Sequence, residues 1–147
     1  MKRIIILVFI FFAFYSCDTV DHFGNTDDTI AGQWNWVRTD GGIAFHIHET
    51  PESTGKSVRL ILTENNKFAL IENNTEVLSG TYKLSLKNSI YSGDQEPFIE
   101  LSEQDQIQAV VLNGIVQIIS ADTLTISDNM YDGVGSTFTR VYSPVLH

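Results

Sequence analysis

The sequence predicts an all-β fold, with strands in an antiparallel meander that closes as a barrel or, alternatively, folds as a β-sandwich. Three observations predict it. Apolar and polar residues alternate with a period of two in short segments, residues typical of tight turns separate these segments, and no window shows sustained helical periodicity. Roughly nine or ten short strands joined in sequence by such turns favour an antiparallel architecture.

The clearest alternation lies in Val77–Leu86, where Tyr82, Leu84 and Leu86 share one face. Asn113-Gly114 stands between two apolar runs and predicts a hairpin, because both positions tolerate a positive φ. The other expected strands are short segments bounded by turn residues: 33–38, 44–49, 58–63, 68–71, 98–101, 107–112, 115–119, 123–126 and 136–142.

Residues 1–16 have the pattern of a secretory signal peptide. Met1-Lys2-Arg3 is a short basic start, and Ile4–Tyr15 is an apolar run without charge, Gly or Pro. The run is too short to cross a membrane as a helix, which takes about 20 residues. We therefore expect the chain to be exported and residues 1–16 to be removed.

Cys17 follows this segment directly and is the only Cys in the chain. Ser16-Cys17 resembles the lipobox of bacterial lipoproteins, in which the Cys is acylated and becomes the new N-terminus, although Phe14 and Tyr15 replace the usual Leu and small residue. Acylation would account for an unpaired Cys in an exported chain. The resemblance implies a lipid anchor in the bacterial cell envelope, at the outer membrane. An ordinary signal cleaved elsewhere and an uncleaved anchor are the alternatives.

The charge balance narrows the range of partners. Two of the 9 basic residues lie in the signal, so 7 basic residues remain against 18 acidic ones, a net charge of −11. Such a surface repels phosphate backbones, which excludes nucleic acid as a partner. Attachment to a membrane would depend on acyl chains at Cys17.

The mature chain divides into a tether and one domain. Residues 17–29 are polar, acidic and aperiodic, which predicts a flexible tether, and residues 30–147 suit one domain.

A family resemblance appears at the start of the first strand. Gly32-Gln33-Trp34 has the G-x-W pattern of the lipocalins, and Arg140 stands on the last strand, where lipocalins and their relatives carry an Arg across that Trp. Residues 50–55 and 122–126 are similar to motifs in the lipocalin-like domains of bacterial lipoproteins. The resemblance implies a roughly eight-stranded lipocalin-like barrel, with Trp34 as a plug at one end and Arg140 stacked on its indole.

The same resemblance implies binding of a small hydrophobic ligand inside the barrel, without catalysis. The alternative is a structural or protein-interaction module whose aromatic side chains fill a solid core. The candidate ligand-binding residues are the aromatic side chains expected in the interior: Trp36, Phe45, Phe68, Tyr82, Phe98 and Phe138.

The sequence contains no clear catalytic or metal-binding motif. The chain has no nucleophile elbow, P-loop or zinc-protease motif, although a pair of carboxylates could still come together. His46 and His48 would share one strand face, but Glu49 points the other way, so a third metal ligand is missing. Asp128–Gly133 carries oxygen ligands without the spacing of an EF-hand loop. We expect no catalytic residues, no metal and no cofactor.

Overall fold

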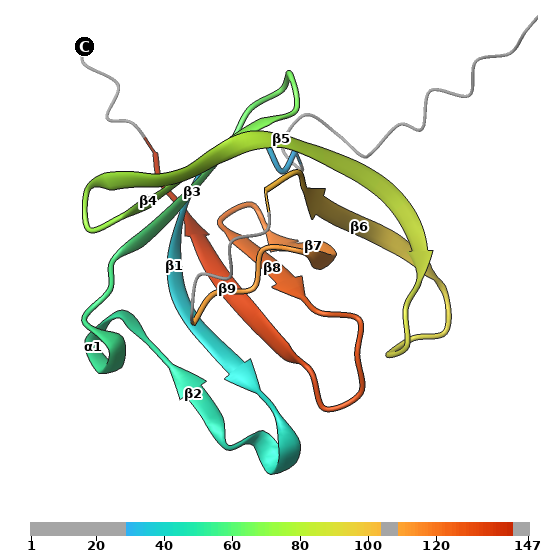
Figure 1. The fold of residues 1–147 in the computed structure, drawn as a ribbon. Helices are drawn as coiled ribbons and strands as arrows, with labels where there is room; N and C mark the ends of the chain where they lie inside the picture. Colours follow the sequence, from blue (N-terminus) through green and yellow to red (C-terminus); the bar gives the residue numbers. More distant parts are fainter. Residues whose placement is uncertain (1–28, 104–108, 143–147) are drawn as a thin grey trace, which may run out of the picture.

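The computed structural model describes residues 29–103 and 109–142, which form a closed antiparallel barrel (Figure 1). The barrel closes because β1 (Gly32–Gly41) pairs with β3 (Val58–Leu62) along one edge and with β9 (Val134–Arg140) along the other. The predicted all-β meander is thus confirmed, as a barrel and not as a sandwich. Residues 1–16, Cys17 and the rest of the tether up to residue 28 lie outside the described residues.

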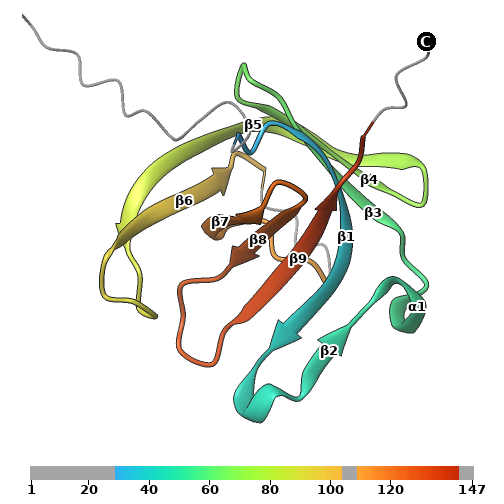
Figure 2. The same ribbon diagram turned by 180° about the vertical axis from the view of Figure 1, so that it is seen from behind.

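Eight strands form the wall, and β2 (Ile47–Glu49) adds a ninth along the end of β1. The wall strands follow one another in chain order, as Figure 2 shows from behind. The remaining strands are β4 (Lys67–Glu72), β5 (Thr75–Asn88), β6 (Gln95–Leu101), β7 (Gly114–Ser120) and β8 (Thr123–Ser127). Helical structure is limited to η1 (Ile43–Phe45) and α1 (Pro51–Thr54), and no helix in the described part of the chain is long and apolar enough to span a membrane.

The core occupies the inside of the barrel. In β3 every second side chain is buried, as the period-two alternation predicts, and β8 repeats the pattern with Leu124 and Ile126. The inward side chains form one cluster, in which Trp34, Leu60, Leu70 and Phe138 are fully buried. An eight-stranded barrel has an interior just wide enough for side chains to fill, and this cluster occupies it.

The predicted hairpin at Asn113-Gly114 is wrong. Residues 109–112 form no strand (residues 107–108 lie outside the described part), and β7 pairs back to β6 through two residue pairs, Phe98–Ile115 and Ile99–Gly114. The glycine serves a close approach instead of a turn, because a Cβ at Gly114 would lie 2.0 Å from the carbonyl oxygen of Ser127. The apolar run before it packs against the core, which explains its strand-like composition.

The strand predicted over 44–49 is shorter than expected. Ala44 and Phe45 have φ values of 58° and 53°, which place both in the left-handed region and interrupt the extended chain. They belong to the η1 turn, and only Ile47–Glu49 remains as strand β2.

Candidate binding groove

One end of the barrel is closed by Trp34 and Arg140, which the structure brings together. The Trp34 side chain is fully buried, and its Nε1 donates to the carbonyl oxygen of Ile30 at 2.8 Å. The Arg140 guanidinium carbon lies 4.1 Å from the centroid of the Trp34 ring. Its nitrogens also donate to three backbone carbonyls, those of Thr29, Ala31 and Ala121. We call this end, where β1 begins, the closed end.

Four of the six aromatic residues expected in the interior do lie there: Trp36, Phe68, Tyr82 and Phe138. Each is at most 4% exposed, and all four belong to the single core cluster. The Tyr82 hydroxyl donates to the carbonyl oxygen of Thr63 at 2.8 Å, and burial raises the pKa of Tyr82 above its ordinary value. Their close mutual packing is that of core residues.

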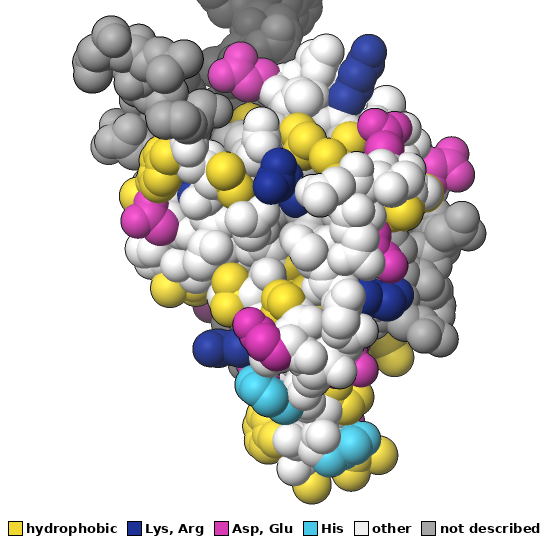
Figure 3. All heavy atoms as spheres, turned by 90° about the vertical axis from the view of Figure 1, so that its left-hand side faces the viewer, with side chains coloured by type: hydrophobic (Ala, Val, Ile, Leu, Met, Phe, Trp, Pro, Cys, Tyr) yellow, Lys and Arg dark blue, Asp and Glu magenta, His cyan; other side chains and the backbone are white. Residues whose placement is uncertain are grey.

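The other two, Phe45 and Phe98, do not face the interior. Phe98 alternates with the buried Ile99 on β6, and the Nζ of Lys87 lies 3.7 Å from the centroid of its ring. Phe45 is 87% exposed on the η1 turn. Figure 3 shows hydrophobic side chains gathered with the two histidines at this projecting tip. The placement of Phe45 follows from its left-handed backbone, which takes it out of the alternating pattern of the sheet.

A buried polar cluster crosses the barrel near the far end of β1. The Thr39 hydroxyl accepts from Nε1 of Trp36 at 3.0 Å and lies 2.6 Å from the hydroxyl of Ser136. Thr39 also donates to the carbonyl oxygen of Ala109 at 2.5 Å, and Ser136 accepts from the N–H of Val111 at 2.8 Å. These bonds hold residues 109–112 against the core. Thr and Ser on a strand look like surface residues in the sequence, so nothing there predicts the cluster.

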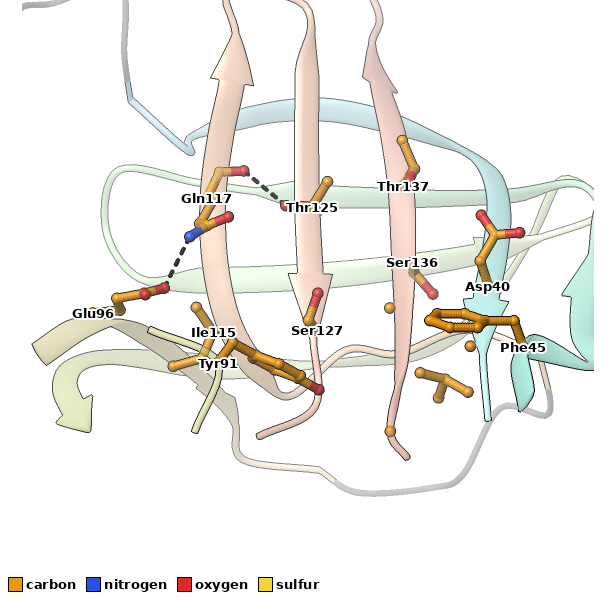
Figure 4. Close-up of a pocket in the computed structure, with 14 residues that line it drawn as sticks. Asp40, Phe45, Tyr91, Glu96, Ile115, Gln117, Thr125, Ser127, Ser136 and Thr137 are labelled. Carbon is orange, nitrogen blue, oxygen red and sulfur yellow. Dashed lines mark hydrogen bonds between the residues drawn. The ribbon is translucent and has the colours of Figure 1, made fainter. Parts of the chain in front are cut away.

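An open groove of about 400 Å³ lies on the outer face of four adjacent strands, β7, β8, β9 and β1 (Figure 4). Two rows of paired residues cross its floor. The residues of the floor are Ile115, Ser127, Gly135 and Asp40 in one row and Gln117, Thr125 and Thr137 in the next. The remaining lining residues come from the end of β1, the η1 turn, the β5–β6 connection, β6, the β8–β9 connection and β9: Gly41, Phe45, Tyr91, Glu96, Gly133, Val134 and Ser136.

Aromatic rings stand over this floor from two different connections. Phe45 comes from η1, and Tyr91 comes from the connection between β5 and β6 (Figure 4). The Tyr91 hydroxyl donates to the carbonyl oxygen of Asp128 at 2.8 Å. Next to η1, the N–H of Gly42 donates to the carbonyl oxygen of Gly133 at 3.0 Å. Both connections are therefore tied to the β8–β9 connection, which fixes the walls of the groove relative to its floor.

Polar side chains in the groove are already ordered by neighbours. Gln117 Nε2 donates to Glu96 at 2.8 Å, and Ser92 donates to the other oxygen of the same carboxylate. Asp40 contacts Nδ1 of His48 at 2.6 Å and Nε of Arg38 at 2.7 Å. The hydrogen bond from His48 is the main cause that lowers the pKa of Asp40, with Arg38 adding to it and burial opposing it.

Asp128 contacts Tyr91 of the groove, because its carbonyl oxygen accepts the hydrogen bond from the Tyr91 hydroxyl. Its Oδ1 accepts from the N–H of Val134 at 3.1 Å, at the base of the β8–β9 connection. Burial raises the pKa of Asp128, and the hydrogen bond from Val134 opposes the shift only in part. Burial raises the pKa of the Tyr91 hydroxyl, the Asp128 carboxylate adds to the shift, and the hydrogen bond to the Met130 carbonyl opposes it.

His46 and His48 do not act as a pair. His46 Nδ1 lies 2.6 Å from the carbonyl oxygen of Ile43, whereas His48 is bound to Asp40. Within residues 29–103 and 109–142, no group of three or more His, Cys, Asp or Glu side chains is placed to hold a metal ion. Asp128–Gly133 forms the β8–β9 connection described above.

Comparison of the chain with protein-family models, with curated proteins and with solved structures found no match.

Proposed function

We propose that this protein is a lipid-anchored, non-catalytic binding protein of the bacterial cell envelope that holds its ligand in the outer groove. The observation that carries the proposal is the groove itself, a hollow of about 400 Å³ between two aromatic walls and a polar floor. Small-molecule sites typically occupy about 300–1,000 Å³ and combine apolar walls with a few ordered polar groups. The groove has that size and that composition.

The packed interior favours binding on the outside of the barrel. A hydrophobic ligand inside would have to displace Trp36, Phe68, Tyr82 or Phe138, all of which are buried in the one core cluster. It would also have to move residues 109–112, which Thr39 and Ser136 hold by hydrogen bonds. Of the two functions that the sequence leaves open, these contacts favour the module with a solid core.

The composition of the groove supports binding without catalysis. The side chains that line it include no His, Cys, Lys or Arg. Ser127 therefore has no imidazole or amine among these lining residues to serve as the general base that a nucleophilic serine needs. Both carboxylates are engaged, Asp40 with Arg38 and His48, and Glu96 with Ser92 and Gln117.

The position of the groove suits a chain anchored at Cys17. The described chain enters at the closed end, and β1 then runs for ten residues to Gly41. At about 3.3 Å per residue, this strand is about 30 Å long. The η1 turn with Phe45 follows at its far end, so an anchor before residue 29 leaves the mouth of the groove free of the membrane surface.

The anchor is tested by Cys17→Ala expressed in the native host. We expect wild-type protein to take up labelled palmitate at Cys17. We also expect it to sediment with membranes, since stable attachment takes two or more acyl chains. The variant should appear in the soluble fraction without label. A variant that still sediments with membranes would contradict lipid anchoring, and it would leave the groove unaffected.

The groove is tested by Thr137→Tyr, with Thr139→Tyr as the matched control. Both residues lie on the outer face of β9, but only Thr137 lines the groove. Native mass spectrometry of full-length protein from its own cells should detect a bound molecule on wild type and on Thr139→Tyr. Thr137→Tyr should lose it, because the added ring occupies the floor. Equal retention by both variants, or a bare mass for the wild type in every growth condition, would overturn the proposal.

A further inference from the structure

We infer that the ligand of the groove is a neutral carbohydrate, held with its ring faces against Phe45 and Tyr91. The inference rests on the proposed function and names the class of molecule that the groove would take. It depends on three features of the lining: two presented aromatic rings, a floor with hydroxyl groups, and an absence of basic side chains.

The first feature is the way in which the aromatic rings are presented. Phe45 is 87% exposed, and both it and Ala44 hold left-handed backbone conformations that are uncommon outside glycine. Such conformations gather at functional sites, where the surrounding structure maintains them. Tyr91 is held by hydrogen bonds from its hydroxyl to the carbonyls of Asp128 and Met130, so its ring is fixed rather than free. A sugar ring has a flat C–H face that packs on such rings.

The second feature is the chemistry of the floor. The hydroxyl groups of Ser127 and Thr137 have no hydrogen-bond partner among the described residues. Ser127 lies between the two aromatic rings, and Thr137 lies in the next row of the floor (Figure 4). Gly135 keeps Ser127 uncovered, because a Cβ there would lie 2.7 Å from the serine oxygen. A sugar presents hydroxyls along its edges, which need partners when they leave water. Ser127, Thr137 and the Gln117 amide offer donors and acceptors along the floor.

The third feature is charge. The lining contains no Lys or Arg, and the full chain carries a net charge of −9, so a phosphorylated, sulfated or acidic ligand would be repelled. Asp40 and Glu96 are the two carboxylates of the lining, and each is already bound to neighbouring side chains. A cationic ligand would have to compete with those partners, which leaves a neutral polar ligand as the best match.

A peptide is a poorer match than a carbohydrate. Extended peptides usually bind by adding a strand to an open sheet edge. In the floor of this groove β8 lies between β7 and β9, and β9 lies between β8 and β1, so the backbone of these two strands is already paired on both sides. What the floor offers is side chains, and these suit a ligand that is recognised through its hydroxyls.

The test is binding of full-length protein in mild detergent to a panel of neutral oligosaccharides of glucose, mannose, galactose, xylose and N-acetylglucosamine. Titration calorimetry would follow for any sugar that binds. We expect Phe45→Ala to weaken binding about tenfold, which corresponds to the loss of one aromatic contact. Tyr131→Ala is the matched control, because Tyr131 is 86% exposed but does not line the groove, and its binding should stay within about twofold of wild type.

The outcomes separate this inference from the proposed function. Binding that weakens in Phe45→Ala and Thr137→Tyr but not in Tyr131→Ala supports a carbohydrate in the groove. Absence of binding to every sugar at millimolar concentration overturns the inference. Binding of peptides instead, in a parallel peptide library and with the same dependence on Phe45, also overturns it while keeping the groove as the binding site.

Discussion

Arg140 lies over the ring of Trp34, with its guanidinium carbon 4.1 Å from the ring centroid, and thereby joins the last strand of the barrel to the first. Gly32 makes this approach possible. Its φ is 150°, and a Cβ at this position would lie 2.7 Å from Nη1 of Arg140. The three residues form one unit: glycine leaves space, arginine occupies it, and the indole below is sealed from solvent.

The plug makes Trp34 a large contributor to stability. We expect Trp34→Ala to lower the free energy of unfolding by about 3–5 kcal/mol, because a fully buried ring is replaced by a cavity. Denaturant unfolding followed by circular dichroism measures it. Val37→Ala, on the outer side of the same strand, is the control and should cost less than about 1 kcal/mol. A loss below about 1 kcal/mol for Trp34→Ala would show that Trp34 is no plug.

Arg140 should not be replaceable by lysine. Its guanidinium donates to the carbonyl oxygens of Thr29, Ala31 and Ala121, and one ammonium group cannot reach all three in this planar geometry. We expect Arg140→Lys to lower the free energy of unfolding by about 1–3 kcal/mol. Arg59→Lys, which exchanges an exposed bond to Asn35, should cost less than about 0.5 kcal/mol. Equal effects of the two substitutions would contradict this role of Arg140.

Thr39 should be the most sensitive member of the buried polar cluster. Thr39→Val keeps the shape of the side chain but removes the partner of Trp36 Nε1 and of the Ala109 carbonyl. Because buried polar groups without hydrogen-bond partners are destabilising, we expect the substitution to lower the free energy of unfolding by about 1–3 kcal/mol. Thr139→Val, at an exposed strand position, is the control. Hydrogen exchange should also accelerate at the N–H of Val111, and unchanged exchange there would contradict the proposed linkage.

Asp128 should make stability depend on pH. Its pKa is raised by burial, so the folded protein binds the proton more tightly than the unfolded chain. The associated stability is present below the unfolded pKa and is lost as pH rises through the folded pKa. The stability of Asp128→Asn relative to wild type should therefore increase as the pH rises above the ordinary pKa of aspartate. Asp132→Asn removes the same charge from an exposed position of the same connection. A relative stability of Asp128→Asn that falls over this range would contradict the burial of the carboxylate.

The sequence predicted the fold better than the groove. Alternation gave the inward faces of β3 and β8 correctly, because one side of each strand is buried throughout. Asn113-Gly114 misled because an apolar run before a turn signal looks like a strand, although the run packs against the core. The glycine was needed for contact with Ser127, and only the three-dimensional structure reveals that neighbour.

The groove could not be predicted because its residues meet only when the barrel closes. Asp40 and Gly135 face each other through the pairing of β1 with β9, and nothing local indicates that register. Within their own strands, Thr125 and Ser127 on β8 and Thr137 on β9 resemble ordinary solvent-exposed residues. Phe45 was expected in the interior because large aromatic residues are usually buried. The sequence does not indicate that Phe45 lies on an exposed turn.

Closure of the barrel also constrains the order in which the chain can fold. The bond between Arg140 Nη1 and the Ala31 carbonyl joins positions 109 residues apart, and β9 pairs with β1 along most of the strand. Contacts so distant in the chain are slow to form and carry a large entropic cost. The ring therefore cannot close until residues 134–140 have been synthesised, so the barrel is completed only by the last part of the described chain.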